Sequence, residues 1–331
     1  MGKHLISVLF SIGFSVLFAL AIVYTSIELI RVINTWMLGL VPDCVLISEF
    51  PRCEEIESRL RVVGYVSLGL VLLTIVVGLT LGRTSLTLLS SVLLYLPTVG
   101  YFAFTMFFLA GVGVLRVLWY PFIDSELFLR LGMITYVPLW TINSILTWIV
   151  GFTALDLSAD FTVPIGFAFM IVGLSVFTLS AATWLYDRLS RRRLSTWGIY
   201  SLSRHPQYLG FIVWSYGFLS LASVVEGGRG WAPPAPGLPW LITSAAVLSV
   251  ALLEEINLRR SMGAEYLSYV RKTPFILPMP NTFLRIARYP AKIITGKEAP
   301  ETRKEVLMTS CLYFALTLLL SLLISYLLPL K

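Results

Sequence analysis

The chain of 331 residues is 57% hydrophobic and only 13% charged, with a mean hydropathy of +0.84. A soluble domain of this length does not need so many apolar residues for its core, so the composition excludes an ordinary soluble enzyme. The formal net charge of +7 does not indicate a nucleic-acid partner, because the basic residues lie between apolar segments. Basic residues in such places orient a membrane protein and contact anionic head groups. We therefore expect an all-α, polytopic transmembrane helical bundle without a metal site.

The apolar segments predict about eight membrane-spanning helices, since a helix needs roughly 20 residues to cross the hydrocarbon core. The first run starts at Leu5 and lacks a small-residue cleavage site, so we interpret it as a retained span rather than a signal peptide. The third run is too long for one straight crossing and contains Pro97, which predicts a kinked helix or a helix followed by a re-entrant piece. The expected spans are 5–30, 62–82, 85–118, 131–153, 161–186, 207–225, 239–256 and 306–328.

Charge near the fifth and sixth spans predicts their orientation. The loop between them carries Arg188, three consecutive arginines at 191–193, and Arg204, whereas the loop before the fifth span carries Asp156 and Asp160. The positive-inside rule then places the arginine-rich loop in the cytoplasm. A Gly/Pro/Trp-rich loop at 227–240 turns the next two spans into a hairpin. Both ends of this hairpin are therefore expected on the cytoplasmic side.

Two polar clusters flank the hairpin and are expected to meet in space. The first reads STWGIYSLSRHPQYLG (195–210) and the second EEINLRRSMGAEYLSYVRKTPFILP (254–278). Arginine and histidine donate to a carboxylate, glutamates accept from an amine or from ribose hydroxyls, and tyrosine rings favour a cation or a flat base. S-adenosylmethionine carries all of these groups, so it is the ligand that the two clusters predict.

The same clusters also carry a family resemblance over roughly residues 161–280. The pattern resembles the integral-membrane methyltransferases, namely the isoprenylcysteine carboxyl methyltransferases and the related phospholipid N-methyltransferases. A lone Arg-His-Pro sequence would be weak evidence for this family. The second motif, at the expected distance from the first, makes the resemblance specific. The matching residues are Gly198, Tyr200, Arg204, His205, Pro206, Tyr208, Gly210, Glu254, Glu255, Leu258, Gly263, Tyr266, Tyr269, Pro274 and Pro278.

The resemblance implies a cytoplasmic cofactor site formed by the hairpin and a C-terminal cap. It also implies a lipid-like or prenylated acceptor, with a carboxylate or an amine, that enters from the bilayer. Glu255 and His205 are the candidates for a catalytic base, although no motif assigns that role. The cofactor-binding residues carried over are Arg192, Arg193, Leu194, Ser195, Tyr200, Arg204, His205, Pro206, Gln207, Tyr208 and Glu254.

The chain divides accordingly into N-terminal helices at 1–155, a methyltransferase core at 156–285, and a connector with a last helix at 286–331. One departure concerns the acceptor. The carboxyl methyltransferases place an arginine one turn before the first glutamate, where this chain has Val250. Positions 250 and 254 share a helix face, so we expect Val250 to project toward the pocket without pairing with a carboxylate. Arg229 and Arg259 are the charged alternatives, but the first sits at the opposite end of the hairpin and the second lies one turn too late. The departure therefore favours a lipid or apolar acceptor other than a prenylcysteine.

Two other functions compete with a methyltransferase. Sterol reductases resemble the C-terminal pattern and bind a nicotinamide cofactor, but their Arg-His-x-Asn-Tyr and Arg-Asp motifs are replaced here by Arg-His-Pro-Gln-Tyr and Glu-Glu. A non-catalytic membrane scaffold that keeps the fold is the third interpretation. A measurement of cofactor binding distinguishes the three functions, because a methyltransferase binds S-adenosylmethionine, a reductase binds a nicotinamide cofactor and a scaffold binds neither.

Overall fold

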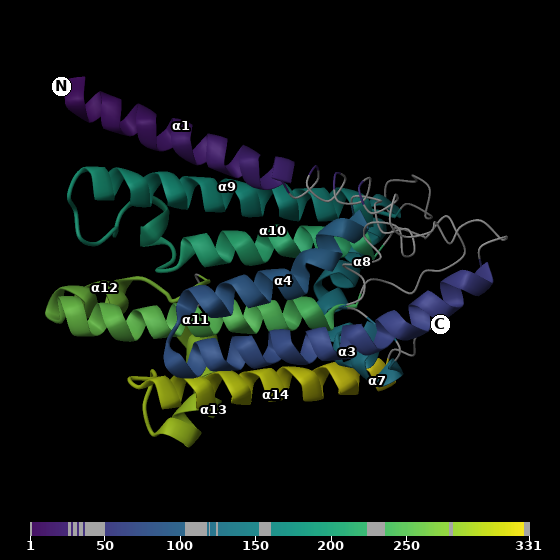
Figure 1. The fold of residues 1–331 in the computed structure, drawn as a ribbon. Coiled ribbons are helices and arrows are strands. Elements are labelled where there is room, and N and C mark those ends of the chain that lie inside the picture. Colours follow the sequence, from purple (N-terminus) through teal and green to yellow (C-terminus); the bar gives the residue numbers. More distant parts are fainter. Residues whose placement is uncertain are drawn as a thin grey trace.

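The computed structural model is helical throughout the residues that it describes, which are 2–25, 28, 32, 36, 50–102, 118, 120–123, 125–151, 160–223, 236–277 and 281–327. Long helices run side by side along one direction, and the short helices lie at the two ends of this bundle (Figure 1). The helices are α1 (Gly2–Tyr24), α3 (Phe50–Leu81), α4 (Thr84–Phe102), α6 (Tyr120–Ile123), α7 (Glu126–Leu131), η4 (Met133–Tyr136), α8 (Val137–Gly151), α9 (Thr162–Leu189), η5 (Gly198–Ser201), α10 (Pro206–Ala222), α11 (Leu238–Met262), α12 (Ala264–Lys272), α13 (Asn281–Thr295) and α14 (Arg303–Leu327).

Six of these stretches are long and apolar enough to cross a membrane, as in a multi-pass membrane protein. They are His4–Tyr24, Arg61–Leu81, Met133–Gly151, Thr162–Leu189, Leu238–Met262 and Arg303–Leu327. The other two of the eight expected spans correspond to α4 and α10. The apolar part of α4 is short, and α10 has only 17 residues. Beyond Phe102, most of the expected third span lies outside the described residues.

Glycines hold α9 and α10 at an unusually close distance. A Cβ atom built on Gly210 of α10 would lie 2.6 Å from the backbone nitrogen of Phe177, and one on Gly173 of α9 would overlap the backbone of Trp214. Two turns further along α10, Gly217 faces Gly166 of α9. A Cβ atom built on Gly217 would lie 2.7 Å from the carbonyl oxygen of Gly166. Small residues let two membrane helices approach until their backbones touch. The hairpin helix α10 is thereby fixed against α9, and the loop between them lies at one end of the bundle.

Buried hydrogen bonds fix α10 and α11 within the bundle. The hydroxyl of Tyr216 on α10 donates to the carbonyl of Thr135 at 2.7 Å, and that of Tyr95 on α4 donates to the carbonyl of Ser215. On α11, Thr243 donates to the carbonyl of Ser91 at 2.9 Å, and Ser249 donates to Ser310 of α14 at 2.7 Å. Polar side chains inside an apolar bundle need such partners, so these bonds restrict how the helices can pack.

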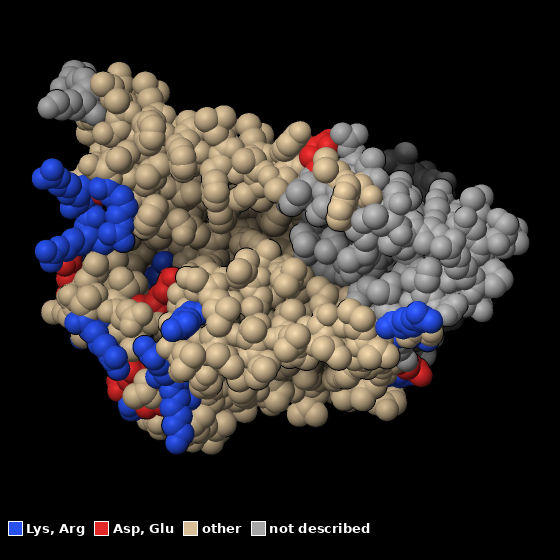
Figure 2. Space-filling model, viewed as in Figure 1, with Lys and Arg blue, Asp and Glu red and all other residues tan. Residues whose placement is uncertain are grey.

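The first helix packs against α9 through a polar contact that the sequence did not indicate. His4, near the start of α1, lies with Nε2 2.7 Å from the hydroxyl of Tyr186 near the end of α9. Lys and Arg side chains gather at the end of the molecule that carries the α9–α10 loop, α12 and α13, and this face is hollowed near mid-height (Figure 2). The charged and apolar parts of the molecule are therefore separated along the bundle.

Candidate functional site

The first polar cluster forms a compact loop between α9 and α10. Two left-handed residues shape it, Arg191 with φ 57° and Gly198 with φ 59°, and glycine adopts such a backbone without strain. His205 precedes α10, and Pro206 occupies the first helical position, where its missing N–H costs nothing. The loop therefore ends at a defined point, with Tyr200, Arg204 and His205 directed inward.

The second polar cluster spans the end of α11 and the whole of α12. The expected span 239–256 implied that Glu254 and Glu255 lie at a helix end. The helix α11 instead continues to Met262, so both glutamates lie about two turns inside it. Gly263, with φ 52°, then turns the chain into α12. This turn directs Tyr266 and Tyr269 back toward the first cluster. Tyr269 donates through its hydroxyl to the carbonyl of Tyr200 at 2.6 Å.

Arg204 joins the two clusters and is buried. Its Nε donates to Oε1 of Glu255 at 2.6 Å, and its Nη1 donates to the carbonyls of Val270 at 3.1 Å and Thr273 at 2.9 Å. Glu255 also accepts from Nη2 of Arg259 at 3.2 Å. Two buried opposite charges stabilise a fold only when their remaining hydrogen-bonding groups are also satisfied. Arg204 meets that condition, and the expected meeting of the clusters is thereby confirmed.

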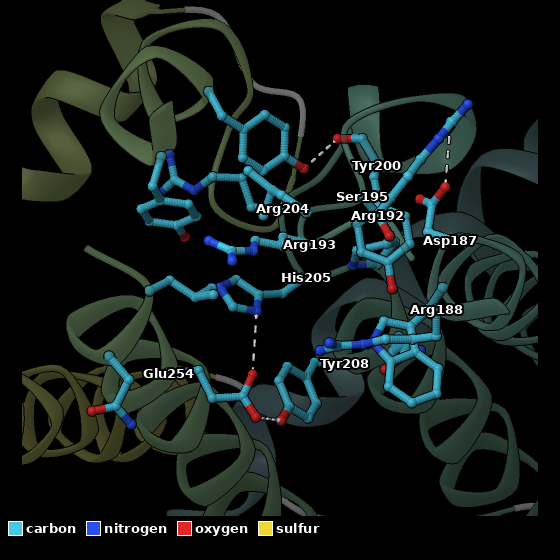
Figure 3. Close-up of a pocket in the computed structure, with 18 residues that line it drawn as sticks. Asp187, Arg188, Arg192, Arg193, Ser195, Tyr200, Arg204, His205, Tyr208 and Glu254 are labelled. Atoms are coloured by element: carbon cyan, nitrogen blue, oxygen red, sulfur yellow. Dashed lines mark hydrogen bonds and ion pairs between the residues drawn. The ribbon is translucent and has the colours of Figure 1, made fainter. Parts of the chain in front are cut away.

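Between the clusters lies a cavity of about 430 Å³. All eleven residues expected at the cofactor site line it, and Figure 3 shows several of them pointing toward one another. The other lining residues include several that the motifs did not single out. The complete lining is Trp184, Asp187, Arg188, Arg192, Arg193, Leu194, Ser195, Tyr200, Arg204, His205, Pro206, Gln207, Tyr208, Glu254, Asn257, Leu258, Tyr266 and Tyr269.

Glu254, His205 and Tyr208 form a polar group on one wall of this cavity. The hydroxyl of Tyr208 donates to Oε1 of Glu254 at 2.6 Å, and Nδ1 of His205 lies 3.9 Å from Oε2 (Figure 3). Nε2 of His205 is 3.5 Å from Oε1 of Glu255 but is not aligned for a hydrogen bond, so this buried nitrogen has no formed partner in the described chain. The buried hydroxyl of Tyr266 likewise has none. Buried polar atoms are rarely left unpaired, so both suggest a missing ligand.

Asp187 anchors the opposite wall, and the motifs did not reveal it. Its carboxylate is buried and accepts from Nε1 of Trp197 at 3.0 Å and from Nη1 of Arg192 at 3.4 Å. Tyr186 stacks edge-on against Trp197 and also meets His4 of α1. The only sequence signal was an acidic residue beside an arginine-rich loop. Asp187 therefore holds Arg192 at the cavity and connects this wall to the first helix.

Burial keeps the tyrosines of the cavity protonated. It raises the pKa of Tyr200, Tyr266 and Tyr269 above the ordinary value, because a phenolate is poorly solvated there. Nearby negative charge adds to the effect at Tyr266, where Glu255 contributes. These three rings can therefore present neutral faces and hydroxyl donors to a ligand at any physiological pH.

Two expected residues are placed differently from their predictions, and a third lies outside the described residues. Glu255, a candidate base, does not line the cavity, because its carboxylate points to the other side of Arg204 and is held by two arginines. Val250 is fully buried in the hydrophobic core and lines neither the cavity nor its opening. Arg229 lies outside the described residues. His205 remains as the only candidate base at the cavity among those we named.

Comparison with known proteins gives one match. Residues 125–273 are similar to the model of a family described as a protein of unknown function, DUF1295, within the steroid reductase- and methyltransferase-like group of membrane proteins. The match covers less than half of the chain and extends from α7 through α12. No curated protein and no solved structure matches the chain. The match includes the first polar cluster and residues 254–273 of the second, and α1, α3, α4, α13 and α14 lie beyond it.

Proposed function

We propose that this protein is an integral-membrane methyltransferase that uses S-adenosylmethionine and acts on a lipid-like or prenylated acceptor from the bilayer. One observation carries the proposal. Two motifs separated by about fifty residues meet across one cavity through the Tyr208–Glu254 and Arg204–Glu255 contacts, each 2.6 Å long. The family resemblance of those same motifs supplies the reaction class.

The lining of the cavity fits the cofactor in size and chemistry. A volume of about 430 Å³ is within the range of small-molecule sites. Arg188, Arg192 and Arg193 offer positive charge to a carboxylate, and Glu254 offers acceptors to an ammonium group or to ribose hydroxyls. The tyrosine faces suit an adenine ring or a sulfonium. His205 and Tyr266 each contribute a buried polar atom that has no partner in the part of the chain that the structure describes.

The chain's own residues bind and orient rather than transfer protons. When bound, S-adenosylmethionine supplies an electrophilic methyl group. Catalysis then depends mainly on holding the acceptor in line and excluding water. Glu255 is engaged by two arginines, and Glu254 accepts a hydrogen bond from the Tyr208 hydroxyl. A carboxylate acceptor needs no base at neutral pH, whereas a protonated amine does. A carboxylate acceptor would thus need no proton transfer from the cavity, whereas an amine acceptor would rely on His205.

We place the cavity on the cytoplasmic side of the membrane, where the cofactor is available. The supporting feature is charge, since Arg188, Arg191, Arg192 and Arg193 lie beside it at one end of the bundle. Basic residues next to membrane spans are retained on the cytoplasmic side. The acceptor would then reach the site sideways from the lipid, between helices.

Calorimetric titration of the purified protein with S-adenosylmethionine and with its demethylated product tests the proposal. We expect saturable binding that is lost in His205→Ala and weakened at least tenfold in Glu254→Gln, because each removes a polar contact from the cavity. Glu126→Gln, an exposed carboxylate on α7, is the matched control and should bind like the wild type. Absence of binding in folded wild-type protein would overturn the proposal.

A reductase is the second candidate, and the arginine cluster supports it. Arg188, Arg192 and Arg193 at one cavity would also suit the phosphates of NADPH. A parallel titration with NADPH distinguishes the two enzymes, since only one cofactor should bind tightly. Failure of both cofactors would leave a non-catalytic scaffold as the function.

A further inference from the structure

A second and larger cavity, of about 660 Å³, lies on the other side of Arg204. It runs along one face of α11, where Trp240, Ser244, Leu248, Leu252 and Arg259 line it at successive turns. A helix rises about 1.5 Å per residue, so these positions extend over about 28 Å, close to the thickness of a hydrocarbon core. The cavity is therefore a long groove and not a rounded pocket. Helices α13 and α14 form its other wall.

The lining changes from charged to apolar along the groove. Glu255 and Arg259 line it near the cytoplasmic end of α11, and Arg288 and Glu298 join them from α13 and the segment after it. Trp240, Leu241, Leu248 and Phe314 line the remainder. Such a gradient is complementary to a molecule with one charged end and a long apolar body, and a compact polar metabolite would leave the apolar part unused.

The balance of charge at the polar end favours an anion. Arg204 and Glu255 neutralise each other, and Glu298 lies 3.7 Å from Lys292. Arg259 uses Nη2 for Glu255, but its buried Nε has no hydrogen-bond partner in the described chain. Arg288 is exposed and forms no ion pair with the described residues. Positive charge is therefore left over at this end of the groove.

A buried hydroxyl on α14 also lacks a partner. Thr309 is only 5% exposed, lines the groove, and has no hydrogen bond from Oγ1 among the described residues. A threonine hydroxyl in a helix normally donates to the carbonyl one turn earlier, as Thr317 does at 2.8 Å. A buried hydroxyl is costly to leave unsatisfied, so Thr309 is a point where the wall can pair with a hydrogen-bonding group.

We propose that this groove binds a single-chain amphiphile with a carboxylate head group. The head lies at Arg259 and Arg288, and the chain lies along α11 toward Trp240. The binding site stands on its own geometry and goes beyond the proposed function. Arg204 lines both cavities and separates the head group from the candidate cofactor site, so this ligand is bound beside that site and is not the methyl acceptor.

The walls from α13 and α14 lie beyond the matched family segment, which ends at residue 273, so the preference for this ligand belongs to this chain and not to the matched segment in general.

Quenching of tryptophan fluorescence by bromopalmitate tests the groove. Wild-type protein should show saturable quenching, and Trp240→Phe should remove much of the quenched signal. Arg288→Gln should weaken binding about 2- to 5-fold, the effect of losing one exposed charge contact. The alcohol and the amine of the same chain length, used as competitors, should displace bromopalmitate less well than palmitate does. Equal competition by all three would overturn the proposal.

A second experiment blocks the groove with a larger side chain. Ala245→Phe places a ring in the groove and should abolish saturable quenching, whereas Ala315→Phe, on the exposed face of α14, should not. Equal binding by these two variants would also overturn the proposal. Calorimetry with S-adenosylmethionine on the same samples separates the two proposals. Cofactor binding without palmitate binding rejects the groove, and palmitate binding without cofactor binding rejects the methyltransferase.

Discussion

Arg204 belongs to a motif that predicts ligand binding, but its main contacts stabilise the fold. The sequence predicts a donor for a ligand carboxylate, but the guanidinium is buried and donates to Glu255 and to two backbone carbonyls, one in the last turn of α12 and one directly after it. Removing one partner of such a network leaves a buried charge and unpaired carbonyls. Arg204 thus holds α12 and its tyrosines against the loop, and acts on a ligand through their positions.

We expect Arg204→Met to lower the free energy of unfolding by about 3–5 kcal/mol, because Glu255 loses a buried partner. The double variant Arg204→Met with Glu255→Leu should recover part of this loss, since no buried carboxylate then remains. Chemical denaturation in detergent measures both. Lys297→Met at an exposed ion pair with Glu301 is the control and should change stability by less than about 1 kcal/mol. If Arg204→Met lowered the free energy of unfolding by no more than the Lys297→Met control does, the structural role of Arg204 would be contradicted.

Buried tyrosines give the site a defined response to alkaline pH. The folded state raises the pKa of Tyr200, Tyr266 and Tyr269, whereas the unfolded chain has a tyrosine pKa of about 10. The folded protein therefore holds these protons where the unfolded chain releases them. Stability from this source is complete below pH of about 10 and is lost as pH rises through the folded values.

Ultraviolet titration of tyrosinate should accordingly show a group of phenols that ionise only together with unfolding. Tyr200→Phe should reduce the size of that late group by one residue. Ionisation of all tyrosines in one step near pH 10, before unfolding, would show that the cavity is solvated.

At the scale of the element, the α9–α10 pair depends on glycine. The matched glycines 173 and 210 allow backbone contact that no side chain permits. This contact determines the width of the loop at 190–205, because the loop joins the two helix ends. Glycine inside a helix normally destabilises it by roughly 0.5–1 kcal/mol relative to alanine, so its presence here reflects packing.

Gly210→Val should separate α9 from α10 and lower stability by about 1–3 kcal/mol, as overpacking does. The loss should be accompanied by weaker cofactor binding, since Tyr200 and Tyr208 lie at the ends of the affected segment. Gly69→Ala on α3 has open space around the new Cβ and should be neutral or stabilising. Thermal unfolding measures both variants, and equal behaviour would contradict the close contact.

At the scale of the whole molecule, the two ends of the bundle differ. One end carries the candidate site, the arginine-rich loop, α12 and α13, and the other carries α7 (Figures 1 and 2). Charge asymmetry of this kind orients a polytopic protein in its membrane. The candidate site is therefore expected on the cytoplasmic side, as the sequence predicts.

Labelling with a membrane-impermeant maleimide tests this orientation in intact cells. In a background where the three native cysteines are replaced, Glu126→Cys on α7 should react from outside. Ser268→Cys on α12 should react only after permeabilisation, although both positions are exposed. Reaction of Ser268→Cys in intact cells would reverse the proposed orientation and would remove the cofactor from the candidate site.

The sequence by itself determined that the protein is a helical membrane protein and which two segments meet at the candidate site. Apolar runs of sufficient length must form helices in lipid, and a two-helix hairpin must return to its starting face, so the clusters at 195–210 and 254–278 had to meet. The eleven expected residues accordingly line one cavity. Local pattern and chain connectivity were enough for that prediction.

Only the tertiary structure decided which side chains face which cavity. Glu254 and Glu255 are adjacent, yet they point about 100° apart around α11, and one lines the site while the other binds Arg204 from behind. The partners of Asp187 come from Trp197 and Arg192, and the groove needs α13 and α14 as its far wall. Such contacts depend on how helices rotate and pack, and that rotation depends on the whole bundle rather than on any single segment.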